Sequence, residues 1–223
     1  MTAFCVYVGS KDVRLLTDGL AIGRYPGAAV PPVTKVRRLR DFGAMTLRGA
    51  ESMLEWFAER ASSATTFEEA VLLVQRAVIE RQKTDLSLAY QLVFCGWSAL
   101  NGPQAYFVAG QAAGEKLPAG AMNPIAPLLT APSLSQSEIF AFLHQSNDRE
   151  RDFPGLMDKL VETDLTGTFG AFCEQTVISE TGVRSEIVRR YGATRPLDRS
   201  YLVALGDDTA LPTVFQRALA RSA

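Results

Sequence analysis

The chain has 223 residues, of which 47% are hydrophobic and 21% are charged, as is ordinary for a globular protein that buries a core. Its 23 Lys and Arg residues nearly balance its 24 Asp and Glu residues, giving a net charge of −1. This balance argues against the basic surface with which proteins bind nucleic acid or anionic membranes. Since no low-complexity linker divides the sequence, we expect one domain over residues 1–223.

The first part of the chain predicts two hairpins of apolar strands. Residues 4–8 and 13–17 form the first hairpin, and both faces of its strands are apolar, which is typical of strands inside a layered protein. Residues 33–39 and 44–48 form the second, joined by a turn that contains a glycine.

Two helices are predicted next. Thr66 and Glu69 are spaced as a capping box, which predicts that the second helix begins there and continues to about Gln82. In the first helix, four apolar residues recur at helical spacing: Met53, Leu54, Phe57 and Ala61.

The second half of the chain predicts two more hairpins, over 90–95 with 104–109 and over 169–178 with 184–191. Helices are expected between and after them. Their predicted ranges are a short helix over 124–130, a helix capped by Ser135 or Ser137 and ending near Gln145, one over 156–162, and one over 212–221.

This order contains no strand–helix–strand alternation of the kind that builds a parallel sheet. An α+β fold, with two antiparallel sheets packed face to face and helices on both outer faces, satisfies it. The sequence lacks a signal peptide pattern and any run of eighteen apolar residues, so we expect a soluble cytoplasmic protein.

The residues most often used as metal ligands are scattered. Cys5, Cys95 and Cys173 are widely spaced within apolar runs, which favours buried free thiols over disulfides or metal ligands. His144 is the sole histidine and has no ligand partners at metal-binding spacing. With no P-loop and no dinucleotide fingerprint, we expect neither a metal nor a cofactor.

Three polar residues near the start of the chain form a pattern. Thr2 follows Met1, Asp18 lies sixteen positions after Thr2 (18 − 2), and Lys35 lies thirty-three after it (35 − 2). A chain that begins with threonine carries a nucleophilic hydroxyl and its own base, the terminal amine. Taken singly, Asp18 is more simply a turn residue and Lys35 a solvated lysine, but the likeness of all three positions to those of one known family favours a functional set.

This pattern resembles that of proteasome β subunits and, more closely, of the peptidase subunit of the bacterial two-component ATP-dependent protease. In that family an N-terminal threonine is followed by an aspartate sixteen residues on and a lysine thirty-two residues on. The lysine here is one residue late, which the loop over 27–32 accommodates as an insertion. The resemblance implies the four-layer αββα sandwich of the N-terminal nucleophile hydrolases.

The resemblance also implies a role for each residue of the set. Thr2, exposed by removal of Met1, would attack the peptide carbonyl. Lys35 would lower the pKa of the terminal amine, and Asp18 would orient Lys35. Gly49, fourteen residues after Lys35 as in the family, would donate its backbone N–H to the oxyanion, although it could equally be a glycine at the start of a helix.

Four further residues would contact the substrate by the same comparison. Leu47 and Ala21 would line the pocket for the side chain before the scissile bond, and both are equally well explained as core residues. An extended substrate would lie between the segments around Ile22 and around Gly49 to Glu51, pairing as an added strand.

Residues that support the terminal amine in the family differ here. The segment 119–123 lacks the family's serine, and Asp164 with Thr166 or Thr168 stands where the family has a second supporting set.

The leading hypothesis is a threonine endopeptidase acting on peptide or unfolded protein inside a homo-oligomeric ring, with a possible partner ATPase. A non-catalytic subunit that retains Met1, and a small-molecule amidase on the same fold, are the alternatives.

Overall fold

The computed structural model describes residues 2–20, 31–84, 90–110, 119–164 and 169–191. Within these residues the strands form two antiparallel sheets of five strands each. The first sheet contains β1 (Phe4–Val8), β2 (Asp12–Asp18), β8 (Leu128–Ala131), β9 (Phe172–Ser179) and β10 (Gly182–Arg190), in the spatial order β10-β9-β2-β1-β8.

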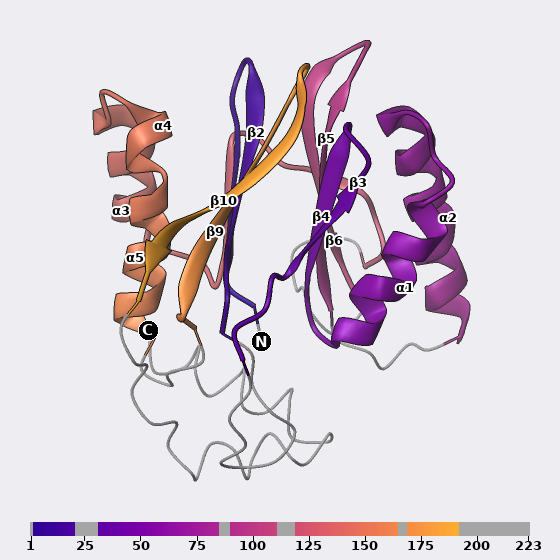
Figure 1. Cartoon of the computed structure of the whole chain (residues 1–223), viewed down its shortest axis with the longest axis horizontal. Helices are drawn as coiled ribbons and strands as arrows, with labels where there is room; N and C mark the ends of the chain where they lie inside the picture. Colours follow the sequence, from indigo (N-terminus) through magenta and orange to yellow (C-terminus); the bar gives the residue numbers. More distant parts are fainter. Residues whose placement is uncertain (1, 21–30, 85–89, 111–118, 165–168, 192–223) are drawn as a thin grey trace, which may run out of the picture.

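The second sheet is built mainly from two hairpins. It contains β3 (Val36–Leu39), β4 (Gly43–Arg48), β5 (Gln91–Ser98), β6 (Gly102–Ala109) and the short β7 (Asn123–Pro124), in sequence order. Figure 1 shows the two sheets side by side, with one group of helices on the outer side of each.

The helices fall into two groups along the sequence. Beside the second sheet lie α1 (Glu51–Ala61) and α2 (Phe67–Thr84). Beside the first sheet lie α3 (Gln136–Phe140), a π-helical turn over Ala141–Gln145, α4 (Arg149–Asp152) and α5 (Pro154–Thr163). None of the helices in the described part of the chain combines the length and apolar character needed to cross a lipid bilayer.

Three clusters of buried apolar side chains hold these elements together. The middle cluster joins the two sheets, with Phe4 and Leu15 from one sheet and Val93 and Phe107 from the other. The other two lie between each sheet and its own helices. Because β5 is buried on both faces, the sequence shows the continuous apolar run Leu92 to Cys95 there rather than alternation.

The two antiparallel sheets and the four hairpins predicted from the sequence are confirmed. The apolar stripe predicted for the first helix is also confirmed, since the residues that α1 buries are Met53, Leu54, Phe57 and Ala61. Ser135 caps α3 in a complete capping box. The helix predicted over 212–221 lies outside the described residues.

The helix predicted over 124–130 is wrong. Residues Asn123–Pro124 are β7, and Leu128–Ala131 is β8, which pairs antiparallel with β1. Pro127 explains the error: a residue that precedes proline is disfavoured in the helical region, and proline provides no N–H for a helical hydrogen bond.

The start of α2 also differs in detail from the predicted capping box. The Thr66 hydroxyl accepts the Glu69 N–H at 3.2 Å, as predicted. The Glu69 carboxylate, however, accepts from the N–H and hydroxyl of Thr65, both at 2.8 Å. The helix start is therefore satisfied by two adjacent threonines rather than one.

Candidate active site

Asp18 is the last residue of β2, and a close contact fixes the chain immediately after it. The Gly19 N–H donates to the Phe172 carbonyl at 2.8 Å, and a Cβ at position 19 would lie 2.3 Å from the Phe172 ring. A side chain at this position would have to displace the Phe172 ring. The Asp-Gly pair therefore ends the strand with the Asp18 side chain in one defined place.

The Asp18 carboxylate is fully buried and binds three groups. The Lys35 ammonium donates to its two oxygens at 2.9 and 3.0 Å, the Ala3 N–H donates at 2.7 Å, and the Leu20 N–H donates at 3.2 Å. The Lys35 side chain is only 10% exposed. One carboxylate thus holds both the lysine and the backbone next to Thr2.

Burial shifts the pKa of both members of this ion pair. It raises the pKa of the Asp18 carboxyl, against the opposing effects of Lys35 and the Ala3 N–H. It lowers the pKa of the Lys35 ammonium, against the opposing effect of Asp18. A lysine whose pKa lies below its ordinary value is a feature common at functional sites, although structural ion pairs show it too.

The end of β4 brings Thr2 and Lys35 to the same strand. The Thr2 hydroxyl donates to the Leu47 carbonyl at 3.1 Å, and the Thr46 hydroxyl donates to the Lys35 carbonyl at 2.8 Å. Thr46 and Leu47, the two β4 residues that form these hydrogen bonds, are adjacent in the strand. The structure therefore brings Thr2, Asp18 and Lys35 to one region, and these are the three residues that the family resemblance predicted to act together.

Gly49 lies two residues beyond Leu47, between β4 and α1. Its φ is 152°, a conformation that residues with a side chain rarely adopt, and the residue is exposed. Ala50, the N-cap of α1, provides no side-chain hydrogen bond to the helix. The exposed backbone at this helix start is of the kind that binds anions, through its N–H groups and the helix dipole.

The residues predicted to contact substrate differ in how exposed they are. Leu47 is 3% exposed and packs in the cluster between the second sheet and its helices, so it is a core residue. The Glu51 side chain is 73% exposed and lies 3.6 Å from Arg37. Ala21 and Ile22 lie outside the described residues.

The two segments that stand where the family has supporting residues take part in local contacts. The Asn123 amide donates to the carbonyls of Ala121 and Phe107 at 2.9 and 3.3 Å. The Asp164 carboxylate accepts the Phe169 N–H at 2.7 Å. Thr166 and Thr168 lie outside the described residues.

Sequence reasoning missed three contacts that build this site, including the backbone contact of Leu47, which it had named only for its side chain. Ala3 and Leu47 act through backbone atoms, so their residue types carry no signal of the contact. Thr46 did carry a signal: it is a polar residue inside an apolar strand, and it is fully buried.

Other candidate groups form no site in the described residues. Cys5, Cys95 and Cys173 are free and buried, as predicted, and burial raises the pKa of each thiol. The His144 ring packs 4.5 Å from that of Phe140. Across the described ranges, no cluster of three or more His, Cys, Asp or Glu side chains is arranged to hold a metal ion.

Comparison of the sequence with models of known protein families gives no match, and a search of curated proteins gives no significant match either.

Proposed function

We propose that this chain is a threonine hydrolase of the N-terminal nucleophile type, with the αββα sandwich of that class, and that it cleaves peptide bonds after removal of Met1. One observation carries the proposal. The buried Asp18 carboxylate binds the Lys35 ammonium with both oxygens and also binds the N–H of Ala3, the residue next to Thr2.

In the proposed reaction the Thr2 hydroxyl oxygen attacks the substrate carbonyl carbon, and its proton passes to the free α-amine of Thr2. The C–N bond of the substrate then breaks. Its amine leaves with that proton, and an ester remains on Thr2. Water attacks the ester carbonyl, the carboxylic acid product leaves, and the Thr2 hydroxyl is regenerated.

Lys35 and Asp18 tune this reaction by charge. An ammonium near Thr2 favours the unprotonated amine, because a neighbouring positive charge lowers the amine's pKa. An α-amine titrates at about 7.7–8.0 when unperturbed, so a modest lowering leaves more of it ready to accept a proton at neutral pH. Asp18 holds the Lys35 side chain in place, which offsets the cost of burying its charge.

The backbone N–H of Gly49 is the proposed donor to the oxyanion. The hydrogen bond from Thr2 to Leu47 supports this role, because it puts the nucleophile beside the strand that leads directly to Gly49. A donor aimed at the developing oxyanion is worth roughly 10²–10³ in rate.

The proposed substrate is an extended peptide or an unfolded protein, paired along the segment from Gly49 to Glu51. Assembly into a homo-oligomeric ring, with a separate ATPase that unfolds substrate, belongs to the same proposal. Its support is the likeness of the Thr2, Asp18 and Lys35 spacing to that of ring-forming peptidases.

The test is the intact mass of the protein before and after incubation with an epoxyketone, a reagent that requires both the hydroxyl and the free amine of an N-terminal threonine. We expect loss of Met1 and one stoichiometric adduct. Thr2→Ala should abolish the adduct. Thr181→Ala, in the exposed turn between β9 and β10, should leave it unchanged.

The outcome also decides between the alternatives. A retained Met1 with no adduct would contradict the catalytic proposal and favour a non-catalytic subunit. An adduct on a protein that remains monomeric by light scattering would instead favour an amidase that acts on small molecules, since such enzymes need no closed chamber.

A further inference from the structure

One hydroxyl in the interior has no partner within the fold. Thr17, in β2, is fully buried, and its hydroxyl oxygen finds no hydrogen-bond partner among the residues that the structure describes. Burying a hydroxyl without a partner costs free energy, and valine would fill the same branched shape without that cost. A buried polar group of this kind therefore needs a reason other than packing.

The Thr17 side chain faces the space between the two sheets. Side chains alternate along a strand, and Val13 and Leu15, at the preceding positions of the same face, belong to the cluster that joins the sheets. β2 also packs against β5 and β6 of the second sheet. The hydroxyl thus lies at the end of this layer where β2 ends in Asp18.

The pairing of β1 with β2 places Thr2 near Thr17 on that face. Phe4 is opposite Thr17, and Thr2 lies two residues before Phe4. The Thr2 hydroxyl also points toward the second sheet, since it donates to the Leu47 carbonyl. Thr2 and Thr17 are therefore diagonal neighbours, a relation that separates Cα atoms by about 7–8 Å. Two polar groups at this separation can be joined by one water molecule.

Removal of Met1 would create a group that suits the Thr17 hydroxyl. The nitrogen of Thr2 then changes from an amide to an α-amine and gains further N–H donors, and a hydroxyl oxygen can accept from them. We propose that Thr17 is a positioning residue of the active site, whose hydroxyl holds the free α-amine of Thr2 through one ordered water molecule. This inference rests on the proposed function.

The contact orients the amine for its role as the base. With an N–H group directed toward Thr17, the lone pair of the nitrogen is left to face the Thr2 hydroxyl, from which it takes the proton. Thr17 touches neither the substrate nor the reacting atoms. Its cost to stability is offset in function, because a base that is already oriented needs no rearrangement during the reaction.

Four charged residues surround this position. Asp18 and Lys35 bind one another beside Thr2, Glu174 is opposite Thr17 on β9, and Arg48 ends β4. All four remain when only position 17 is changed. A shift in the pKa of the amine in a Thr17 variant therefore reports the loss of the hydroxyl.

The test is the rate at which Thr2 forms the epoxyketone adduct, followed by intact mass at several pH values and reagent concentrations. For Thr17→Val we expect the rate at saturating reagent to fall about tenfold, the effect of one lost hydrogen bond to a charged group, with the half-saturating concentration unchanged. The acidic limb of the rate should move to lower pH, because a hydrogen bond that favours the ammonium is lost. Thr17→Ser, which keeps the hydroxyl, should restore both.

Thr176→Val is the matched control. Thr176 is fully buried, and it lies on the same face because it is opposite Leu15. Its hydroxyl shares a hydrogen bond with that of Ser185 at 2.8 Å. This variant should form the adduct at the unchanged rate but unfold at a lower urea concentration. Thr17→Val loses no hydrogen bond within the fold, so it should unfold at a higher urea concentration than Thr176→Val.

The outcomes separate this inference from the proposed function. If the unchanged chain forms no adduct, the proposed function fails and the inference fails with it. If the adduct forms equally fast in Thr17→Val, or if its acidic limb does not move, the inference alone is overturned. Unfolding of Thr17→Val at a lower urea concentration than Thr176→Val would also overturn it, because the hydroxyl would then serve the fold.

Discussion

At the scale of single residues, removing one partner of the Asp18–Lys35 pair is expected to destabilise the fold by more than burial of the intact pair does. The carboxylate is fully buried, and the Lys35 side chain is 10% exposed. Removing one charge from such a pair leaves the other uncompensated, which costs more than the pair contributes as a whole.

We therefore expect Asp18→Asn to lower the free energy of unfolding by about 3 kcal/mol, the lower part of the range for broken buried pairs, because Lys35 retains some contact with water. Urea unfolding at neutral pH measures it. The matched control is Glu51→Gln, which removes an exposed carboxylate 3.6 Å from Arg37 and should cost at most about 1 kcal/mol. Losses of equal size in the two variants would show that Asp18 and Lys35 do not form a buried ion pair.

The shifted pKa of Lys35 sets a pH dependence for the proposed activity. Burial lowers this pKa below its ordinary value of 10.5, so the ammonium loses its proton at a lower pH than a free lysine would. The rate of peptide hydrolysis should thus fall as the pH rises through the Lys35 pKa, below pH 10.5. Lys35→Arg should move this alkaline limb upward, because a guanidinium stays charged. An alkaline limb unmoved in that variant would assign it to another group.

A likeness in spacing was enough to predict which three residues lie near one another, but not how they are held. Thr2, Asp18 and Lys35 were predicted as a set from the likeness of their spacing to that of a known family, and in the structure Asp18 binds the Ala3 N–H while the Thr2 hydroxyl binds the Leu47 carbonyl. Those links use backbone N–H and C=O groups, which every residue type has. No residue pattern can therefore reveal them before the register of the strands is known.

At the scale of elements, α2 approaches its sheet over a pair of glycines. Gly43 on β4 and Gly96 on β5 are register partners, and the Phe67 ring from the first turn of α2 lies over them. A Cβ at Gly96 would lie 1.9 Å from that ring. The two glycines provide the space that the aromatic side chain fills.

Gly96→Ala should therefore destabilise the fold by about 1–3 kcal/mol, the usual cost of overpacking a core. Thermal or urea unfolding measures the loss, and adding Phe67→Leu should recover part of it by making room for the new methyl group. Gly155→Ala in α5 is the control, since a Cβ there meets nothing within 4 Å and should be neutral or stabilising. A neutral Gly96→Ala would show that α2 does not pack this closely.

Element prediction succeeded where the pattern was local and failed where pairing at long range decided the outcome. The residues of the α1 stripe lie within one helix, and those of the α3 cap, Ser135 and Glu138, lie three positions apart, so in each case the local sequence contained the whole signal. Residues Leu128–Ala131 form a strand because β1 offers them an edge to pair with. A partner strand more than one hundred residues away leaves no local signature.

At the scale of the whole molecule, the layered arrangement could be predicted from the order of the hairpins. Which hairpins lie next to one another in each sheet could not. The pairing of β2 with β9 joins the first and last hairpins of the described chain. Arg14 is a further case: its guanidinium is nearly buried and binds Asp12 at 2.8 Å and Glu150 at 2.6 Å. The last of these contacts depends on where α4 docks, which composition and periodicity do not encode.

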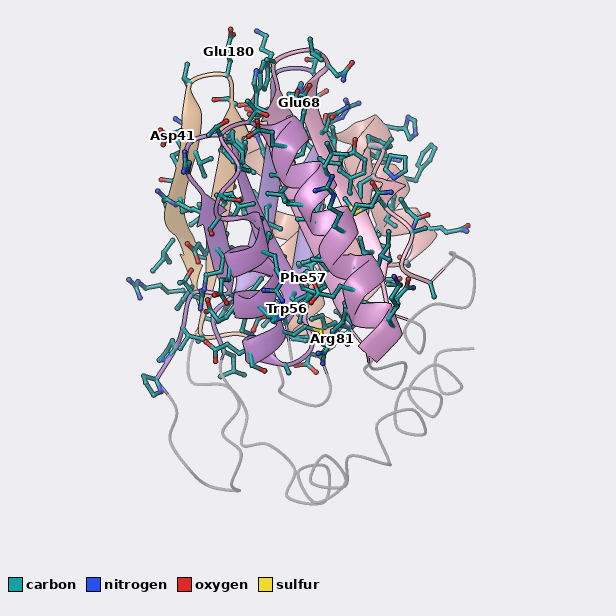
Figure 2. All side chains as sticks on the ribbon, turned by 90° about the vertical axis from the view of Figure 1, so that its right-hand side faces the viewer. Asp41, Trp56, Phe57, Glu68, Arg81 and Glu180 are labelled. Atoms are coloured by element: carbon teal, nitrogen blue, oxygen red, sulfur yellow. The ribbon has the colours of Figure 1, made fainter. Side chains whose placement is uncertain are left out.

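The antiparallel register of β2 and β9 separates the two ends of the molecule. Asp12 is opposite Ser179, and Asp18 is opposite Cys173, so the β9–β10 turn lies at the end of the sheet remote from Asp18. Six residues of strand correspond to about 20 Å. Glu180 in this turn projects from the upper end of the view in Figure 2. A fluorophore attached there, on a cysteine introduced at Thr181, would report tumbling and assembly while leaving the chemistry of the distant threonine untouched.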